Sequence, residues 1–310
     1  MDRFKRIAVL YNAANSDKIA LKRAAVLAGN NKAKILAVHI DEPISSATQL
    51  LLGQERIKQF LSDRQYNVEH HFAKHMEEID HGKIPLKIAS GDQGVETIRF
   101  ILENKCDLLM KTRDTPSKRQ AISVTDMKLL RKCPVPVMLI KPGRKKHFNR
   151  IMAAVDLAPE KPASNELLKN ILGLATSLSV REGAELDIVH AWQTFATTTL
   201  QGPRFKLSNS DVEEIKTKEK KLRESWLEEA ISPYIDLDIK IRTHLFPGDP
   251  ADVLTDFATK RRTDLLVMGS LGRGGLQGLL IGNTAERVLD NVSCSTLTIK
   301  PDDFICPVKV

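Results

Sequence analysis

Short apolar runs rich in β-branched residues alternate along the chain with longer segments in which apolar residues recur at helical spacing. The segment 164–178 is a clear helical example, with Leu167, Leu168, Ile171 and Leu172 on one face. This alternation predicts an α/β fold in which a parallel sheet is covered by helices on both faces. Strands are predicted at 6–12, 33–40, 84–90, 106–111 and 135–141, and again at 150–156, 184–192, 238–246, 264–269 and 295–300.

The second half of the chain repeats the first. A segment that begins Asp107-Leu-Leu matches one that begins Asp264-Leu-Leu, and each leads to a Lys-Pro pair. The spacing between matched residues grows along the chain, as a duplication with small loop insertions produces. We therefore expect two tandem domains of about 150 residues, 1–146 and 147–310, each a doubly wound, Rossmann-like sheet of five parallel strands. Other matched pairs are Asn12 and Asp156, His39 and His190, Gly91 and Gly248, and Thr125 and Thr284.

Composition agrees with a folded, soluble protein. The chain is 42% hydrophobic and 28% charged, and it has no apolar run near the roughly 18 residues that a membrane helix needs. The first residues lead into a strand without an apolar signal region, which predicts a cytoplasmic protein with no membrane partner. The four cysteines lie far apart with no Cys-x-x-Cys pair, so neither a zinc knuckle nor a redox dithiol is indicated.

The net charge of +8 raises the question of nucleic-acid binding. The basic residues are scattered among acids, which is typical of solvated helix faces. One compact basic run, 144–147, lies at the boundary between the repeats and is interpreted as a linker. We therefore predict no specific nucleic-acid partner.

The strongest chemical signal is a glycine-rich loop behind the fourth strand of the second half. Gly269, Gly272 and Gly282 let the backbone approach an anion closely, so that successive amides can point at phosphate oxygens. Asn283 begins a helix whose free amides favour negative charge, and Asn283 or Thr284 can also donate to a phosphate. The loop is therefore a candidate phosphate site.

The glycine-rich loop also allows other interpretations. Arg273 can add positive charge, although an exposed loop arginine is usually only solvated. A P-loop requires a lysine that is absent, and a dinucleotide fingerprint follows the first strand rather than the fourth. Glycines that merely make a flexible turn are the structural alternative.

In a parallel sheet of this kind, ligands bind outside the carboxyl ends of the strands. Asp156 follows the first strand of the second half, His190 and Trp192 lie at the end of the second, and Gly269 ends the fourth. These residues can converge on one crevice. Each also has a structural reading, in which Asp156 caps a turn and His190 and Trp192 belong to the core.

The spacing Gly269-x2-Gly272-x9-Gly282, followed by Asn283-Thr284, resembles the nucleotide-binding motif of the universal stress protein family. The duplication resembles the tandem members of that family. The resemblance implies an adenine nucleotide alpha hydrolase-like fold, a stress-survival role that includes resistance to DNA damage, and ATP or another adenine nucleotide as ligand, with or without Mg²⁺. The ligand residues that we predict are Asp156, Ala191, Met268, Gly269, Gly272, Arg273, Gly282, Asn283 and Thr284.

Within this set, the resemblance assigns the adenine and ribose contacts to Asp156 and Ala191, and the phosphate contacts to the glycines and Asn283. The family has Ser or Thr where Asn283 stands, so Thr284 can take over that contact. The first half departs much further from the motif. Asn12 replaces the acid, residues 111–114 replace the glycines, and Ser123 stands in place of Gly282. We predict that the first half binds no nucleotide in the family manner.

No catalytic residue is predicted, because the loop offers amides and the nearest acid, Asp156, is expected at the ribose. No metal site is predicted either, since His71 and His75 lack a third ligand. Two alternatives stay open: a scaffold for an apolar ligand, and a slow nucleotide hydrolase. The apolar run 50–52 could belong to a lid over such a ligand, although ordinary core packing is the expectation.

The assembly is predicted from the last strands of the two repeats. Relatives with one domain pair through this strand, which implies that segments 135–141 and 295–300 join the two domains as an internal pseudo-dimer. A further homodimer is compatible with the sequence.

Overall fold

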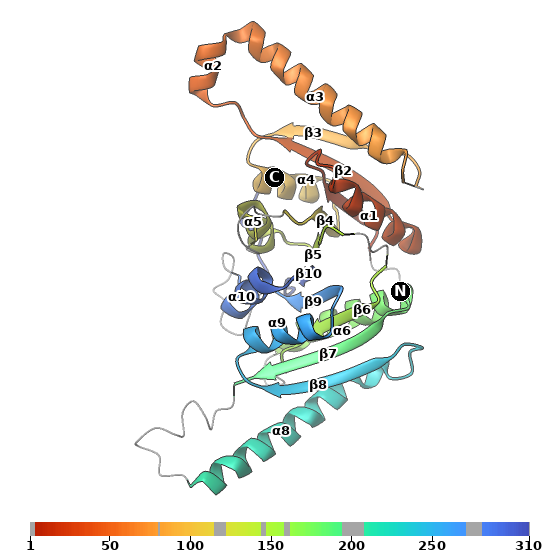
Figure 1. The fold of residues 1–310 in the computed structure, drawn as a ribbon, viewed down its shortest axis with the longest axis vertical. Coiled ribbons are helices and arrows are strands. Elements are labelled where there is room, and N and C mark those ends of the chain that lie inside the picture. Colours follow the sequence, from red (N-terminus) through yellow and green to blue (C-terminus); the bar gives the residue numbers. More distant parts are fainter. Residues whose placement is uncertain are drawn as a thin grey trace. The chain divides into compact units, whose positions relative to one another are not determined.

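The chain separates into two compact units in a computed structural model (Figure 1). The first unit comprises Met1–Thr115, Ile122–Arg144 and Cys306–Val310, and the second consists mainly of Lys145–Ile305. The C-terminal residues therefore belong with the first unit, where the Cys306 thiol lies 3.5 Å from the Lys132 carbonyl oxygen. The structure describes residues 4–79, 81–114, 122–143, 147–157, 162–193, 208–270 and 281–309.

The first unit is a parallel sheet in the strand order β3-β2-β1-β4-β5, with helices between consecutive strands. Its strands are β1 (Arg6–Leu10), β2 (Lys34–Asp41), β3 (Leu86–Ser90), β4 (Leu108–Thr112) and β5 (Val137–Ile140). Its helices are α1 (Asp17–Asn31), α2 (Ser46–Leu52), α3 (Gln54–Met76), α4 (Gln93–Glu103) and α5 (Val124–Lys132).

The second unit repeats this topology in the order β8-β7-β6-β9-β10, again with parallel pairing. Its strands are β6 (Arg150–Ala154), β7 (Glu185–Trp192), β8 (Ile241–Pro247), β9 (Leu265–Gly269) and β10 (Ser295–Ile299). Its helices are α6 (Pro162–Glu182), α8 (Asn209–Ile231), α9 (Pro250–Lys260) and α10 (Asn283–Asn291), with a 3₁₀ turn at Ser232–Tyr234.

The central strands are buried on both faces. Ile7, Ala8, Val9 and Leu10 are consecutive residues of β1, and all have no solvent exposure. Because consecutive side chains of a strand point to opposite faces, both faces of the sheet must be covered. The predicted α/β class, with two tandem doubly wound parallel sheets, is confirmed.

The aspartate of the repeated Asp-Leu-Leu sequence makes the same contact in both units. In the first unit, Asp107 accepts the backbone amide of Arg6 at 3.0 Å, and in the second unit Asp264 accepts that of Arg150 at 3.1 Å. Both arginines start the first strand of their sheet. The carboxylate thus satisfies an amide at the strand entrance and ties the start of the fourth strand to the start of the first.

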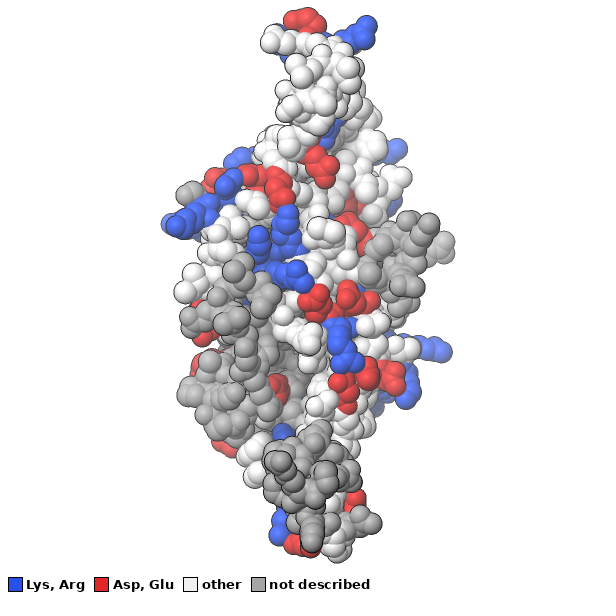
Figure 2. Space-filling model, turned by 90° about the vertical axis from the view of Figure 1, so that its left-hand side faces the viewer, with Lys and Arg blue, Asp and Glu red and all other residues white. Residues whose placement is uncertain are grey.

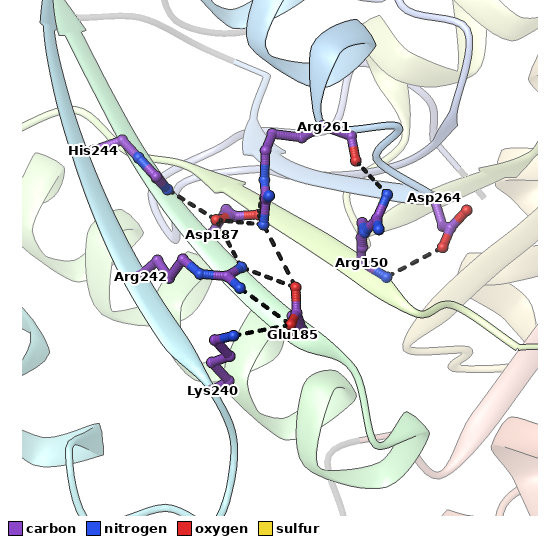
Figure 3. A network of polar contacts seen from close by, with 8 residues as sticks. All are labelled: Arg150, Glu185, Asp187, Lys240, Arg242, His244, Arg261 and Asp264. Carbon is purple, nitrogen blue, oxygen red and sulfur yellow. Dashed lines mark hydrogen bonds and ion pairs between the residues drawn. The ribbon is translucent and has the colours of Figure 1, made fainter.

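A charge network holds the opening half of β7 against β8 and α9 in the second unit (Figure 3). Asp187, 1% exposed, accepts from His244 at 2.8 Å and from the Arg261 Nε at 3.1 Å. Glu185, two residues earlier on the same face, receives a two-pronged bond from Arg242 at 2.9 and 3.1 Å. These pairs bridge neighbouring strands and therefore support the register that places the carboxyl end of β7.

Charge on the molecular surface is mixed in sign. Figure 2 shows Lys and Arg side chains lying next to Asp and Glu side chains on the face that it presents. Ion pairs between surface side chains include Lys128 with Asp92 and Arg287 with Asp252. On this face the positive net charge is therefore spread rather than gathered into one patch.

The apolar run 50–52 is not core material. Helix α2 has no buried residue, and Leu50 and Leu51 are 87% and 84% exposed. The expectation of ordinary packing is therefore wrong for these two side chains, because α2 and the start of α3 extend beyond the strands of the first unit (Figure 1). Among the described residues, no helix combines the length and the apolar character needed to span a bilayer.

A buried ion pair closes the carboxyl end of β4. Lys111 and Asp126 are both fully buried, with their charged atoms 2.8 Å apart. Lys111 also lies 2.6 Å from Asp114. Burial raises the pKa of Asp126, and the neighbouring lysine opposes this shift. The equivalent positions of β9 and α10 hold Met268 and Ala285, so the second unit has no such pair at this place.

We expect that Asp126→Ala destabilises the first unit by on the order of 3 kcal/mol, because it leaves the Lys111 ammonium buried without its fully buried carboxylate partner. The double variant Lys111→Met, Asp126→Ala introduces the residues of the second unit and should recover most of that loss. Urea denaturation of the full chain, followed by circular dichroism, measures both. A double variant that is no more stable than the single one would contradict this account.

Acid should weaken the network of Figure 3 through Glu185. Its hydrogen bond from Arg242 holds the pKa of Glu185 at about 2, below the ordinary 4.5. A lowered pKa in the folded state means that the stabilisation is complete above pH 4.5 and is lost as the pH falls toward about 2. Glu185→Gln should therefore lower the thermal midpoint near neutral pH, and the difference from wild type should narrow across this window. Glu228→Gln, an exposed change on α8, serves as the control.

Candidate functional site

A pocket of about 490 Å³ opens at the carboxyl ends of the strands of the second unit. Its floor comes from the ends of β6, β7 and β9, and its sides come from α6, α8, α9 and the start of α10. This is the edge at which parallel α/β sheets bind ligands. The lining residues are Ala154, Val155, Asp156, Leu167, Ile171, Ala191, Trp192, Gln193, Arg223, Asp249, Pro250, Leu254, Met268, Gly269, Gly282, Asn283, Thr284 and Ala285.

Strand order brings the predicted residues together. Strand β6 pairs with β9 on one side and with β7 on the other. Asp156, just beyond β6, therefore lies between Gly269 at the end of β9 and Ala191 near the end of β7. Adjacent strands are about 4.8 Å apart, so the floor spans about 10 Å from β9 to β7.

Of the predicted ligand residues, Gly272 and Arg273 lie outside the described residues. The structure places the other seven on the wall of this one pocket: Asp156, Ala191, Met268, Gly269, Gly282, Asn283 and Thr284.

Gly269 allows a close approach between β9 and α6. A Cβ atom added at this glycine would lie 2.9 Å from the Leu167 Cδ2 and 3.7 Å from the Ile171 Cδ1. The equivalent residue of the first unit, at the end of β4, is Thr112. The glycine therefore leaves space at the pocket floor that a larger residue would fill.

The two units treat the corresponding helix start differently. In the first unit, the Ser123 hydroxyl accepts the amide of Asp126 at 3.1 Å and donates to Asp114 at 2.7 Å. In the second unit, α10 begins after Gly282, which has no side chain to cap the helix. The first amides of a helix have no partner within the helix, so those of α10 can serve an anion in the pocket.

A histidine positions the strand end that carries Asp156. The His190 Nδ1 lies 3.0 Å from the carbonyl oxygen of Val155, and a carbonyl can only accept, so Nδ1 carries the proton. The first unit repeats this contact between His39 and the carbonyl oxygen of Tyr11 at 2.7 Å. The matched histidines thus have a structural role, and His190 acts on the site through the backbone.

Asp249, which directly follows the repeated glycine Gly248, also lines the pocket. It caps α9 by accepting the amides of Ala251 and Asp252 at 3.0 and 3.2 Å, and it pairs with Arg287 at 3.0 Å. Burial alone would raise the pKa of Asp249, but Arg287 and the backbone amides outweigh it and hold that pKa below the ordinary value. The repeated Gly-Asp pair marks this cap, since Asp92 caps α4 in the same way.

Two further residues, Trp192 and Arg223, line the pocket; the sequence places Trp192 at this edge of the sheet, whereas Arg223 belongs to a segment with no motif. Trp192 ends β7 and is 5% exposed, while Arg223 comes from the middle of α8. The Arg223 guanidinium carbon lies 5.2 Å from the centre of the Trp192 ring. A charge-rich helix face offered no sign that one of its arginines reaches the pocket, because only the packing of α8 brings it there.

Of the two histidines at helical spacing in α3, His71 is exposed and His75 has a packing role. The His75 Nδ1 lies 3.0 Å from the Tyr11 hydroxyl, and burial lowers the pKa of His75. Among the described residues, no group of three His, Cys, Asp or Glu side chains is arranged to hold a metal ion.

A model of the Universal stress protein family matches residues 3–141 and, a second time, residues 147–300. The Universal stress protein E homolog of Haemophilus influenzae is 29% identical, with 96% of this chain and 98% of that protein covered. Universal stress protein E of Salmonella typhi is 30% identical over 73% of this chain and 71% of the relative.

Solved structures share the fold over nearly the whole chain. A functionally unknown protein from Pseudomonas aeruginosa PAO1 gives a TM-score of 0.72 at 24% identity, with 97% of this chain and 94% of that chain covered. A universal stress protein from Archaeoglobus fulgidus gives 0.64 at 16% identity, with 96% of each chain covered. With both halves matched in tandem, the chain belongs to the universal stress protein family.

Proposed function

We propose that the second unit binds an adenine nucleotide, ATP or a close relative, as a regulatory ligand in the pocket at the ends of β6, β7 and β9. The observation that carries this proposal is the start of α10. Its leading residues line the pocket, and Gly282 leaves their amides without a side-chain cap. Amides at a helix start, together with the helix dipole, attract phosphate oxygens.

The rest of the pocket suits the remaining parts of a nucleotide. Its volume of about 490 Å³ lies within the range of about 300–1,000 Å³ that is typical of small-molecule sites. Asp156 lies between the phosphate end and Ala191, where a carboxylate can accept the ribose hydroxyls. Leu254 and Ala191, on the wall toward β7, supply apolar contact for a flat base.

The acids of the pocket support a regulatory role rather than a catalytic one. Asp249 is held by Arg287 and by two amides of α9, so it is poorly placed to take a proton from water. Asp156 has the ribose as its expected partner. We propose that nucleotide occupancy is the signal that the protein reports during stress, with survival of stress, including DNA damage, as the biological outcome.

The first predicted domain, residues 1–146, is proposed as the structural partner of a sensing domain, residues 147–310. Lys111, Asp114 and Asp126 fill the end of its β4 with charges that belong to the chain itself. Ser123 caps its α5, so the amide that a phosphate would need already has a partner. These contacts support the prediction that this unit binds no nucleotide in the family manner.

Asn283→Asp tests the phosphate end. A carboxylate at the first residue of α10 should stabilise the helix through its dipole, yet it should lower ATP affinity by on the order of tenfold or more through repulsion of phosphate. Calorimetric titration with ATP measures the effect. Val124→Asp places the same charge at the first residue of α5 in the first unit and should leave affinity unchanged. Equal affinities of both variants and wild type would remove the phosphate assignment.

The identity of the ligand can be tested directly. Protein purified under native conditions and then denatured should release an adenine nucleotide, which chromatography with mass spectrometry identifies. Release of an apolar compound in its place would favour the scaffold alternative, and ADP formation in a timed incubation with ATP would favour the slow hydrolase.

A further inference from the structure

The β7 end of the pocket is lined by an aromatic and a cationic side chain that come from different elements. Trp192 ends β7 and stacks on His190, with ring centres 5.8 Å apart and planes inclined by 9°. Arg223 reaches from α8 over the Trp192 ring and lies 3.3 Å from the His190 Nε2. Because the His190 Nδ1 donates to a carbonyl, its Nε2 accepts from Arg223.

Three buried polar atoms of this cluster have no hydrogen-bond partner within the described part of the chain. They are the Trp192 Nε1, the Arg223 Nε and the Glu219 Oε2. The first two are donors on residues that line the pocket. Buried donors are almost always satisfied in folded proteins, because an unpaired one has lost its bonds to water without replacement. Two such donors beside one pocket indicate that an acceptor from a ligand belongs there.

The first unit has a corresponding cluster, at a strand end for which no ligand is proposed. Strand β2 ends at Asp41, as β7 ends at Trp192, and α3 supplies Arg64 as α8 supplies Arg223. Asp41 pairs with Arg64 and with His39, so the arginine is neutralised by an acid of the sheet. The unit that retains the pocket has Trp192 in place of that acid.

The replacement changes what holds the arginine. Arg223 pairs instead with Glu219 of its own helix at 2.8 Å. It contacts the sheet through the face of the Trp192 ring and through the His190 Nε2. Its Nε therefore remains unpaired while its charge is balanced. A neutral acceptor, such as a ring nitrogen or carbonyl oxygen of a base, suits this pair of donors better than a second phosphate.

We propose that Trp192 and Arg223 select the nucleotide at its base end, by donating their indole and Nε hydrogens to acceptor atoms on the edge of a purine. The proposal rests on the nucleotide function of this pocket. The phosphate end lies at β9 and α10, and Trp192 lies two strands away, at the distance where the base of a nucleotide ends.

Binding of a base at these donors also affects the contact between α8 and the sheet. Both donor atoms are shielded from solvent, so the side chains around them must shift for a base to reach them. Arg223 belongs to α8, and its contact with Trp192 ties that helix to the end of β7. A base held by both donors therefore contacts α8 and β7 together.

Calorimetric titration of the full chain with ATP tests the proposal. Trp192→Phe keeps an aromatic ring against His190 but removes the indole donor, and it should lower ATP affinity by about tenfold. Trp226→Phe is the matched control. The centre of the Trp226 ring lies 5.9 Å from the Arg223 guanidinium carbon, but Trp226 does not line the pocket. This control should bind ATP as wild type does.

Tryptophan fluorescence gives a second readout that does not depend on the folding of Trp192→Phe. The chain has two tryptophans, so in Trp226→Phe all tryptophan emission comes from Trp192. ATP should change this emission as the base reaches the indole. Inorganic tripolyphosphate, which can occupy the phosphate end alone, should leave it unchanged.

Two results would overturn the role of Trp192 and Arg223 and leave the proposed nucleotide function intact. One is a wild-type ATP affinity in Trp192→Phe, and the other is an equal response of Trp192 emission to ATP and to tripolyphosphate. If wild type itself binds no ATP, both are overturned. Loss of affinity in Trp192→Phe, with normal binding in Trp226→Phe and a response to ATP alone, supports the proposal.

Discussion

The first amides of a helix need acceptors, and the two units of this protein meet that requirement in different ways. In the first unit, Ser123 caps α5, and Asp114, Asp126 and Lys111 close the space beside it with charges of the chain. In the second unit, Gly282 provides no cap, and α10 opens onto a pocket of about 490 Å³. The same strand–loop–helix arrangement is thus satisfied from within in one copy and opens onto a pocket in the other, where we propose that a ligand binds.

This difference extends across the sheet. At the end of the second strand, the first unit joins Arg64 to Asp41, whereas the second unit lays Arg223 over Trp192. Both changes remove charge pairs of the chain from the carboxyl edge of the second sheet. One edge of the duplicated fold is thus closed by its own side chains, while the other holds a pocket, and the proposed division into a structural and a sensing unit rests on this difference.

The scaffold beneath the two edges is shared. Asp107 and Asp264 join the first and fourth strands at their entrances, and His39 and His190 hold the ends of the first strands. These contacts use backbone groups, so they survive changes in the surrounding side chains. They explain why the edges could diverge while the strand order remained the same.

Sequence alone was sufficient for the repeat, the fold class and most of the pocket floor. Each depends on a local signal: alternation of apolar runs, glycines behind a buried strand, or an acid directly after one. Parallel strands end at a common edge, so the sequence alone places Asp156, Ala191 and Gly269 together. The exposure of Leu50 and Leu51 was not foreseen, because an apolar run does not say whether the rest of the protein reaches it.

Only the tertiary structure decided which distant side chains complete the site. Arg223 lies in a charge-rich helix face that looks solvated, and the sequence offers no ligand signal at Asp249, yet both line the pocket. Lys111 ends a predicted strand, and nothing in the local sequence shows that it is fully buried between two carboxylates. The position of a side chain on its own helix or strand follows from local periodicity, whereas its partners depend on how whole elements pack, and that packing is a property of the folded chain.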